Sequence, residues 1–232
     1  MQIVKNYLTD FTHLFFPHVC EGCGSDIIER PNIICAKCFS ILPKTGFFNY
    51  LENPVAKIFY GRIKIQNAAS AFYFTKHSLI QNLLIQLKYR GNKDIGIFLG
   101  KLTGLQINKS SLFRDIDLII PLPLNKKKEF KRGYNQALLI CQGIAEVLQK
   151  PINKNAVIRT VFTETQTHQN RVSRWQNMED VFEVLLPEEI KGKHILLVDD
   201  VVTTGATLEA CGQKILQIEG IQLSIATVAF TL

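Results

Sequence analysis

Apolar residues recur along this chain with two different spacings that alternate with one another. Short apolar runs rich in β-branched residues predict strands at 67–74, 116–120, 157–160, 181–184, 195–198 and 221–230. Spacings of three and four residues predict helices over 79–89, 135–149 and 208–218. A further helix carries Gly96, Gly100 and Gly104 at four-residue spacing, which would let it pack closely on a neighbour. Strands that alternate with helices predict an α/β fold, with a mostly parallel sheet covered by helices on both faces.

The same pattern divides the chain into three expected parts. Residues 1–43 form a small N-terminal module, in which 1–16 read as an amphipathic helix or, alternatively, as a frayed tail. Residues 44–64 read as a connector, because Gly46, Pro54 and Gly61 interrupt any period. Residues 65–232 form the main domain.

The most informative stretch is HILLVDDVVTTGATL at 194–208. A buried strand at 195–198 is followed by the paired carboxylates of Asp199 and Asp200, a polar turn and a helix. Ligands of open α/β sheets bind beyond the carboxyl end of such a strand. Threonine hydroxyls, a glycine and the free N–H groups of a helix start can cradle one phosphate. The residues expected to form this cradle are Thr203, Thr204, Gly205, Ala206 and Thr207.

The two aspartates restrict which phosphate ligand can bind there. A carboxylate about 4 Å from a phosphate costs ~1 kcal/mol in water and ~4 kcal/mol at an effective dielectric constant of about 20. The site therefore favours a phosphate followed by neutral hydroxyls, or a bridging Mg²⁺. A 5-phosphoribosyl group is such a ligand, because its phosphate can bind in the turn while its ribose hydroxyls contact the two acids. The alternative is a buried strand with a polar loop at its exit.

Four of the six cysteines form two CxxC pairs, Cys20/Cys23 and Cys35/Cys38. Thiolates at this spacing can close a tetrahedron around one Zn²⁺, and four sulfur ligands make such a site structural rather than catalytic. Disulfides or unliganded thiols are the alternatives. Cys141 and Cys211 lie among apolar residues and read as small core residues.

A second candidate is the segment PLPLNKKKEFKRGYNQA at 121–137, which leaves one predicted strand and enters a helix. It carries five cations in seven positions, 126–132, and would lie on the ligand edge of the sheet. Asn135 lies at the start of the predicted helix, where an N-cap residue is expected. A solvated basic loop is the alternative for the lysines. Lys88 either reaches a phosphate or extends along its helix end to solvent.

These residues resemble two related groups of proteins. The stretch at 194–208 is similar to the fingerprint of type I phosphoribosyltransferases, which bind 5-phosphoribosyl 1-diphosphate (PRPP). The whole chain resembles the ComF family, linked to competence and DNA uptake. That resemblance rests on the cysteine pairs, Leu87–Tyr89, Pro121–Leu124, Arg132–Gln136 and the spaced set Gln166, Arg174, Asn177 and Phe182. Gln169 departs from the family, which has an apolar residue there.

The resemblance implies roles for these positions. Asp199 and Asp200 would hold the ribose hydroxyls of PRPP, with Mg²⁺, and residues 203–207 would hold its 5-phosphate. The implied diphosphate loop and mobile flap comprise Leu122, Pro123, Leu124, Asn125, Arg132, Asn135, Gln136, Gln166, Arg174 and Asn177.

Composition and charge point to an anionic partner without naming it. The chain has 232 residues, 47% of them hydrophobic, and a net charge of +7, which favours phosphates and nucleic acid. Tyr89, Tyr134 and Trp175 lie near basic residues and could stack bases of single-stranded DNA, or be half-buried packing residues. No apolar run reaches ~18 residues, and polar residues at 10–13 interrupt any signal peptide, so a cytoplasmic protein without a membrane span is expected.

Three functions remain open at this stage. The first is an Mg²⁺-dependent phosphoribosyltransferase, for which the sequence shows no acceptor pocket or general base. The second is a non-catalytic module that keeps the phosphoribosyl site and docks on single-stranded DNA or proteins of the DNA-uptake machinery. The third is a PRPP sensor without turnover.

Overall fold

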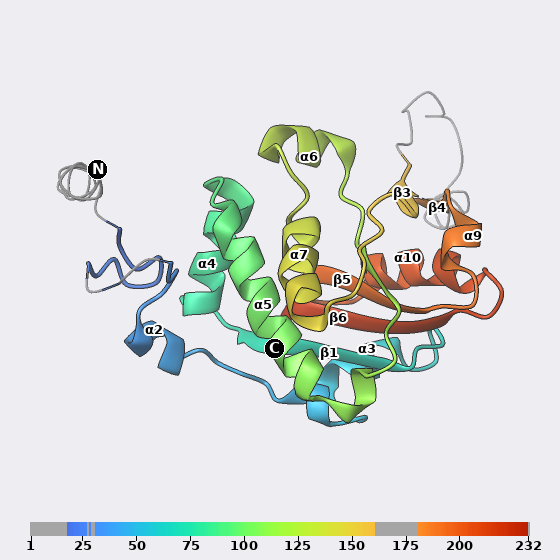
Figure 1. Cartoon of the computed structure of the whole chain (residues 1–232), viewed down its shortest axis with the longest axis horizontal. Helices are drawn as coiled ribbons and strands as arrows, with labels where there is room; N and C mark the ends of the chain where they lie inside the picture. The colour runs from blue at the N-terminus through green and yellow to red at the C-terminus, as the bar shows by residue number, and fades with distance from the viewer. Residues whose placement is uncertain (1–17, 27, 29–30, 161–180, 232) are drawn as a thin grey trace, which may run out of the picture.

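The computed structural model describes residues 18–26, 28, 31–160 and 181–231 (Figure 1). Its helical elements are α2 (Ala36–Ser40), η1 (Phe47–Asn49), α3 (Pro54–Phe59), α4 (Leu79–Tyr89), α5 (Lys93–Lys109), η2 (Ser111–Phe113), α6 (Lys126–Arg132), α7 (Gln136–Leu148), α9 (Pro187–Ile190) and α10 (Ala206–Leu216). Its strands are β1 (Asn67–Phe74), β2 (Leu118–Pro121), β3 (Val157–Arg159), β4 (Phe182–Val184), β5 (His194–Val202) and β6 (Gln222–Thr231). None of the helices in these ranges is long and apolar enough to cross a bilayer.

A four-stranded parallel sheet with the order β1-β6-β5-β2 forms the centre of the molecule. Its strands are buried along most of their length, and in β6 burial is continuous from Leu223 to Ala229. Strands covered on both faces read as continuous apolar runs rather than as alternating patterns. The predicted α/β fold with a mostly parallel sheet is confirmed.

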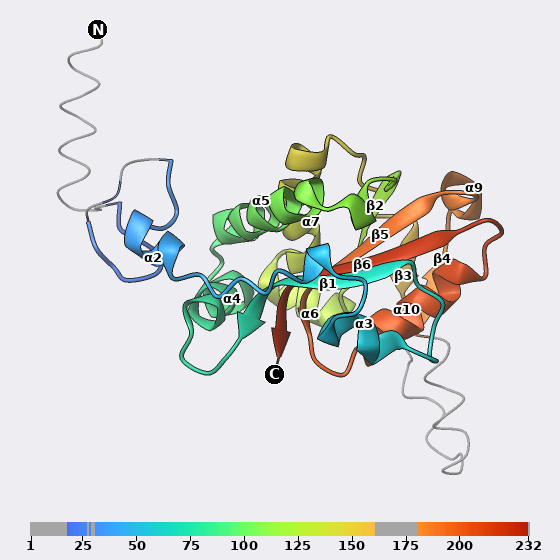
Figure 2. The same cartoon turned by 90° about the horizontal axis from the view of Figure 1, so that it is seen from below.

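Helices cover both faces of this sheet, with α5 and α7 on one face and α3 and α10 on the other (Figure 2). Glycines let α5 and α7 approach closely. A Cβ added to Gly100 would lie 2.2 Å from the carbonyl oxygen of Ile140, and one added to Gly143 would lie 2.1 Å from that of Ile97. The close packing expected of the glycine-spaced helix is therefore present, and α7 is its partner.

A second, antiparallel pair joins β3 to β4, with Val157 opposite Val184. Both strands were expected from the sequence pattern. Residues 161–180, which connect them, lie outside the described residues. Gln166, Arg174 and Asn177, expected in a flap, fall in this segment, as do Gln169 and Trp175.

Residues 44–64 are more regular than the sequence pattern indicates. Pro54 does not interrupt a helix but begins α3, where its fixed φ and missing N–H are tolerated. The side chain of Asn53 caps this helix by accepting from the N–H groups of Val55 and Ala56 at 3.0 and 3.1 Å. Phe59 is completely buried, so α3 is part of the core.

Strand β5 is longer than expected, and this changes where the acids lie. Asp199 and Asp200 do not follow the strand but belong to it, because pairing with β6 continues from Asp199 opposite Thr227 to Val202 opposite Phe230. Successive side chains of a strand point to opposite faces. The two carboxylates therefore leave the sheet on different sides, near its carboxyl end.

Candidate functional site

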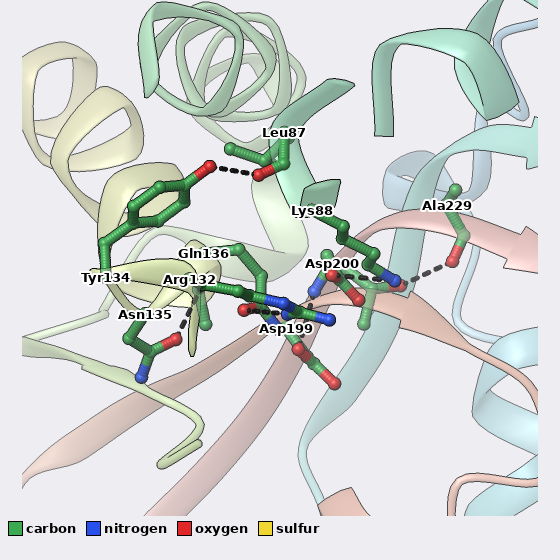
Figure 3. A network of polar contacts seen from close by, with 11 residues as sticks. Leu87, Lys88, Arg132, Tyr134, Asn135, Gln136, Asp199, Asp200 and Ala229 are labelled. Carbon is green, nitrogen blue, oxygen red and sulfur yellow. Dashed lines mark hydrogen bonds and ion pairs between the residues drawn. The ribbon is translucent and has the colours of Figure 1, made fainter. Parts of the chain in front are cut away.

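Asp200 is a buried carboxylate held by a lysine from another element. Its side chain is 6% exposed, and its Oδ2 lies 2.9 Å from Nζ of Lys88 near the end of α4 (Figure 3). The sequence left two roles open for Lys88, contact with a phosphate or extension along the helix end to solvent. The structure shows a different contact, an ion pair with Asp200. A buried carboxylate needs such a partner to remain ionised.

Asp199 has a different environment: part of the residue reaches solvent, but its carboxyl is closely surrounded by protein. Burial raises the pKa of its carboxyl to about 8, and the negative charge of Asp200 adds to this shift. The backbone N–H of Asp200, which donates to Asp199 Oδ1 at 2.8 Å, and the charges of Lys88 and Arg132 act in the opposite direction.

The five residues of the expected phosphate cradle, 203–207, comprise the turn after β5 and the first two residues of α10. Thr203, Thr204 and Thr207 are exposed, so their hydroxyls are available to a ligand. Gly205 has φ +73° and is the N-cap of α10, with no side-chain hydrogen bond to the N–H groups of the helix start. A helix start with open N–H groups next to free hydroxyls is a suitable anion site. We call residues 203–207 the phosphate turn.

Arg62, which was not predicted as a site residue, contacts this turn from the side of α3. Its Nη1 donates to the carbonyl oxygen of Thr204 at 2.9 Å, and its Nη2 forms an ion pair with Glu209 of α10. Arg62 is more than 140 residues away in the chain from both Thr204 and Glu209. No local sequence signal could have found this contact.

The segment Arg132–Gln136 contacts two other parts of the site and is held by one internal hydrogen bond. Asn135 is the N-cap of α7, as expected, and its Nδ2 donates to the carbonyl oxygen of Leu122 at 3.0 Å. The hydroxyl of Tyr134 donates to the carbonyl oxygen of Leu87 in α4. Nη1 of Arg132 donates to Oε1 of Gln136 at 2.6 Å (Figure 3). These contacts connect the expected diphosphate loop to the helix that carries Lys88.

The lysine-rich segment after this loop is a short helix, α6, rather than an irregular loop. Asn125 caps it by accepting from the N–H of Lys127 at 3.0 Å, and none of its residues is buried. It projects from the body of the molecule, and Phe130 on it is 94% exposed (Figure 1). A helix without a buried face is not held by the core.

A cavity of about 490 Å³ opens between α4 and α6. Tyr89 at its rim is 74% exposed, and the guanidinium of Arg132 lies 5.5 Å from the centre of its ring. The side chains that line the cavity include four cations and no acid. The residues that line the cavity are Lys88, Tyr89, Gly91, Lys128, Lys131, Arg132 and Tyr134. We call this cavity the basic pocket.

A smaller cavity of about 280 Å³ lies on the other side of the expected diphosphate loop. Pro123 and Leu124 of the loop line it, together with Lys126, Lys154 and Arg159. The loop Leu122–Asn125 thus borders a hollow in which these three cations lie together with one acid, Glu129.

The four paired cysteines come together at the opposite end of the chain, before and within α2. Their sulfur atoms all lie within 4.8 Å of one another, and those of Cys23 and Cys35 are 3.8 Å apart. With Zn–S bonds of about 2.3 Å, the edge of a tetrahedral site is about 3.8 Å long. The cysteines Cys20, Cys23, Cys35 and Cys38 can therefore hold one metal ion.

Local hydrogen bonds prepare one of these sulfurs to be a thiolate. Burial opposes ionisation of Cys20, but backbone N–H groups outweigh it and lower the pKa of this thiol to about 6. The donors include Cys35 at 3.2 Å and Gly22 at 3.4 Å. Thiolates are the form that binds metal. Cys141 and Cys211 are fully buried core residues, as expected.

Comparison with known proteins places this geometry in a family. Residues 135–231 match the family described as phosphoribosyl transferase domain. Competence protein F of Haemophilus influenzae is 33% identical over 222 residues, which cover 90% of this chain and 96% of that protein. DNA utilization protein YhgH of Escherichia coli (strain K12) is 33% identical over 138 residues, and the match spans 60% of its length.

Among solved structures, the glutamine phosphoribosylpyrophosphate amidotransferase from B. subtilis, complexed with ADP and GMP, superposes with a TM-score of 0.43. It is 14% identical in sequence and covers 61% of this chain and 30% of its own. The sheet topology and the family match together describe a type I phosphoribosyltransferase-like fold. From its identity to competence protein F over nearly the whole length of both proteins, the chain belongs to the ComF family.

Proposed function

We propose that this chain binds PRPP, or a related 5-phosphoribosyl ligand, together with Mg²⁺ at the carboxyl end of β5. The observation that carries the proposal is that the carboxylate pair at the end of β5 is separated by only two residues from the phosphate turn, which leads directly into α10. A phosphorylated pentose offers a phosphate for the turn and neighbouring hydroxyls for the carboxylates.

Each part of the ligand has a chemically suitable partner. The 5-phosphate would accept hydrogen bonds from the threonine hydroxyls and the N–H groups that open α10. The ribose hydroxyls would meet Asp199 and Asp200. The diphosphate would extend towards Lys88 and Arg132, the two cations whose charges already act on Asp199.

The donor chemistry also fits Mg²⁺, which is typically bound by one or two carboxylates together with substrate phosphates. Asp199 and Asp200 are the residues that would hold it, directly or through the ribose hydroxyls. When bound, Mg²⁺ would supply positive charge that offsets the charge of the diphosphate.

The reaction that such a site supports is transfer of the phosphoribosyl group. The bond between C1 and the diphosphate oxygen breaks, positive charge develops on the sugar ring as in glycoside cleavage, and an acceptor forms the new bond at C1. The charge that develops on the leaving diphosphate requires fixed cations, and the chain offers Lys88 and Arg132 for this role.

Calorimetric titration with PRPP, with and without Mg²⁺, tests the binding proposal. We expect the wild type to bind, and the double variant Asp199→Asn/Asp200→Asn to bind at least tenfold more weakly while remaining folded. The paired control Glu52→Gln/Glu183→Gln removes the same charge at exposed positions and should bind like the wild type. Equal affinities for all three proteins would remove the acids from the site.

Turnover is measured separately, as release of diphosphate in the presence of candidate base acceptors. Release would support the transferase. Tight binding without release, and without affinity for DNA, would support a PRPP sensor instead.

A second candidate function is binding of single-stranded DNA, and the basic pocket favours it. Four cations line this pocket, one of which, Lys88, also pairs with Asp200, and the exposed aromatic rings of Tyr89 and Phe130 lie on α4 and α6. Cations and exposed rings are what backbone binding and base stacking require. The names of the relatives, competence protein F and DNA utilization protein, support a role linked to DNA uptake. DNA-uptake proteins would then be partners.

Fluorescence anisotropy with a labelled oligothymidine, measured over a range of salt concentrations, tests this second function. Each neutralised phosphate contributes a slope of about −0.7 to log K against log salt. We expect Lys128→Gln/Lys131→Gln to weaken binding and flatten the slope, whereas Lys76→Gln/Lys109→Gln, at exposed positions elsewhere, should do less. Binding that is absent or independent of salt would exclude this function.

We also propose that the cysteine cluster holds a structural Zn²⁺. Four sulfur donors in a closed tetrahedral set leave no position for a substrate. The site would stabilise the fold of the N-terminal module, which is joined to α4 by a hydrogen bond from Gln86 Nε2 to the carbonyl oxygen of Glu21 at 2.8 Å.

A further inference from the structure

Arg62 joins three segments at the rear of the phosphate turn. Its Nη1 donates both to the carbonyl oxygen of Ile58 at 3.0 Å and to that of Thr204 at 2.9 Å. Its Nη2 pairs with Glu209, in the first turn of α10. The side chains of the ion pair are 37% and 19% exposed. One guanidinium thus holds the end of α3, the turn and the start of α10 together.

The bond to Thr204 fixes the orientation of one peptide plane in the turn. In a trans peptide the C=O and the following N–H point in opposite directions. A Thr204 carbonyl that is held towards Arg62 therefore directs the N–H of Gly205 away from Arg62, to the other side of the turn. Anion-binding turns work because amides face the ligand, whereas a carbonyl oxygen would repel a phosphate.

This peptide plane needs an external restraint because it precedes a glycine. Gly205 has φ +73°, and glycine adopts positive and negative φ with similar ease. The turn cannot obtain rigidity from a side chain at this position, since an added Cβ would lie 2.6 Å from Cγ2 of Ile58. The close approach of α3 thus requires glycine at 205, and the restraint comes from Arg62.

We propose that Arg62 is a positioning residue that keeps the amides of the phosphate turn directed at the ligand. This inference rests on the proposed function and deepens it by assigning a role to the segment between α3 and β1. Arg62 acts through the Thr204 carbonyl rather than through its own charge, which Glu209 already balances. A lysine at this position would keep the charge but lose the forked pair of donors.

Titration of the full-length chain with ribose 5-phosphate, which carries the phosphate and ribose but no diphosphate, tests this role. We expect Arg62→Ala to weaken binding at least tenfold and Arg62→Lys at least threefold. Glu209→Gln keeps the bond to Thr204 and should weaken binding less than twofold. Arg114→Ala removes an exposed arginine between η2 and β2 and should bind like the wild type.

Thermal unfolding and the ¹H–¹⁵N resonance of Gly205 separate positioning from a general loss of structure. The Gly205 amide should shift on addition of ribose 5-phosphate in the wild type and much less in Arg62→Lys. A lower melting temperature in Arg62→Ala with wild-type affinity would show a merely structural role and overturn the inference. Should Arg62→Ala fail to fold, Arg62→Lys decides by the same criteria.

The outcomes also separate this inference from the function on which it rests. If the wild type binds neither PRPP nor ribose 5-phosphate, the proposed function and the inference both fail. If the wild type binds and the arginine variants bind equally well, the phosphoribosyl site stands and only the role of Arg62 is wrong.

Discussion

Nζ of Lys88 lies 2.9 Å from Oδ2 of Asp200, and this ion pair connects the end of α4 to the ligand edge of the sheet. Asp200 is 4% exposed, and Lys88 offsets the cost of burying its carboxylate. Lys88 also lines the basic pocket. The same ammonium therefore faces both the proposed ribose site and the pocket where a diphosphate or a nucleic-acid backbone would lie.

Removal of this lysine should destabilise the protein, because it leaves a buried carboxylate without a partner. We expect Lys88→Met to lower the free energy of unfolding by about 1–3 kcal/mol, below the range for fully buried pairs since Lys88 is partly exposed. Urea denaturation at neutral pH measures this. The double variant Lys88→Met/Asp200→Asn should recover most of the loss, and no recovery would show that the pair does not couple the two residues.

The raised pKa of Asp199 predicts a pH-dependent stability. The carboxyl has a pKa of about 8 in the folded chain against 3.8 as its ordinary value, so the folded state binds more protons between these values. The stabilisation is complete below pH ~4 and is lost as the pH rises through 8. The free energy of unfolding of the wild type should therefore fall relative to Asp199→Asn by up to about 1.4 kcal/mol per pH unit.

Denaturation of both proteins from pH 5 to pH 8 is the measurement, with Glu52→Gln as a control for removal of an exposed charge. Parallel curves for the wild type and Asp199→Asn would contradict a raised pKa at this position.

Zinc content tests the cysteine cluster. Metal analysis of the purified chain should find about one zinc per molecule, because four thiolates saturate one tetrahedral ion. Cys20→Ser should lose the metal and the fold of the N-terminal module, since a structural zinc site contributes folding energy directly. Cys141→Ala, at a buried core position, should keep its zinc. A folded chain that contains no metal would refute the site.

Close packing of α5 and α7 predicts a steep penalty for one added methyl group. Gly143→Ala places a Cβ 2.1 Å from a backbone oxygen, so the helices must separate, and we expect a loss of more than about 2 kcal/mol of stability. Gly212→Ala meets only side-chain atoms, at 2.9 Å and beyond, and should cost less. Equal penalties in urea denaturation would show that the helices can adjust freely.

Much of the fold could be predicted because its signals are local. Buried parallel strands such as β1 read as continuous apolar runs, and α4 shows the three- and four-residue spacing of a packed helix. Pro54 was wrongly interpreted as an interruption of any helix. Proline can also occupy the first position of a helix, and the side-chain cap at Asn53 shows that it does so in α3. The helical form of the basic segment was not predicted, because α6 has no buried face and therefore no apolar period.

The site was predictable where its parts are contiguous and not where distant segments meet. The acids and the phosphate turn lie within nine residues of one another, so residue types and spacing were sufficient. The pairing of Lys88 with Asp200 and that of Arg62 with the turn join segments more than 100 residues apart. The length of β5 was also missed, because carboxylates inside a strand interrupt the apolar run that marks it.

A crystal structure of the chain with ribose 5-phosphate and Mg²⁺ tests the central claim most directly. The account predicts that the phosphate accepts hydrogen bonds from the backbone N–H groups and hydroxyls of residues 203–207, with the ribose hydroxyls on the side of Asp199 and Asp200. A phosphate bound elsewhere, or a turn whose carbonyls face the ligand, would contradict it.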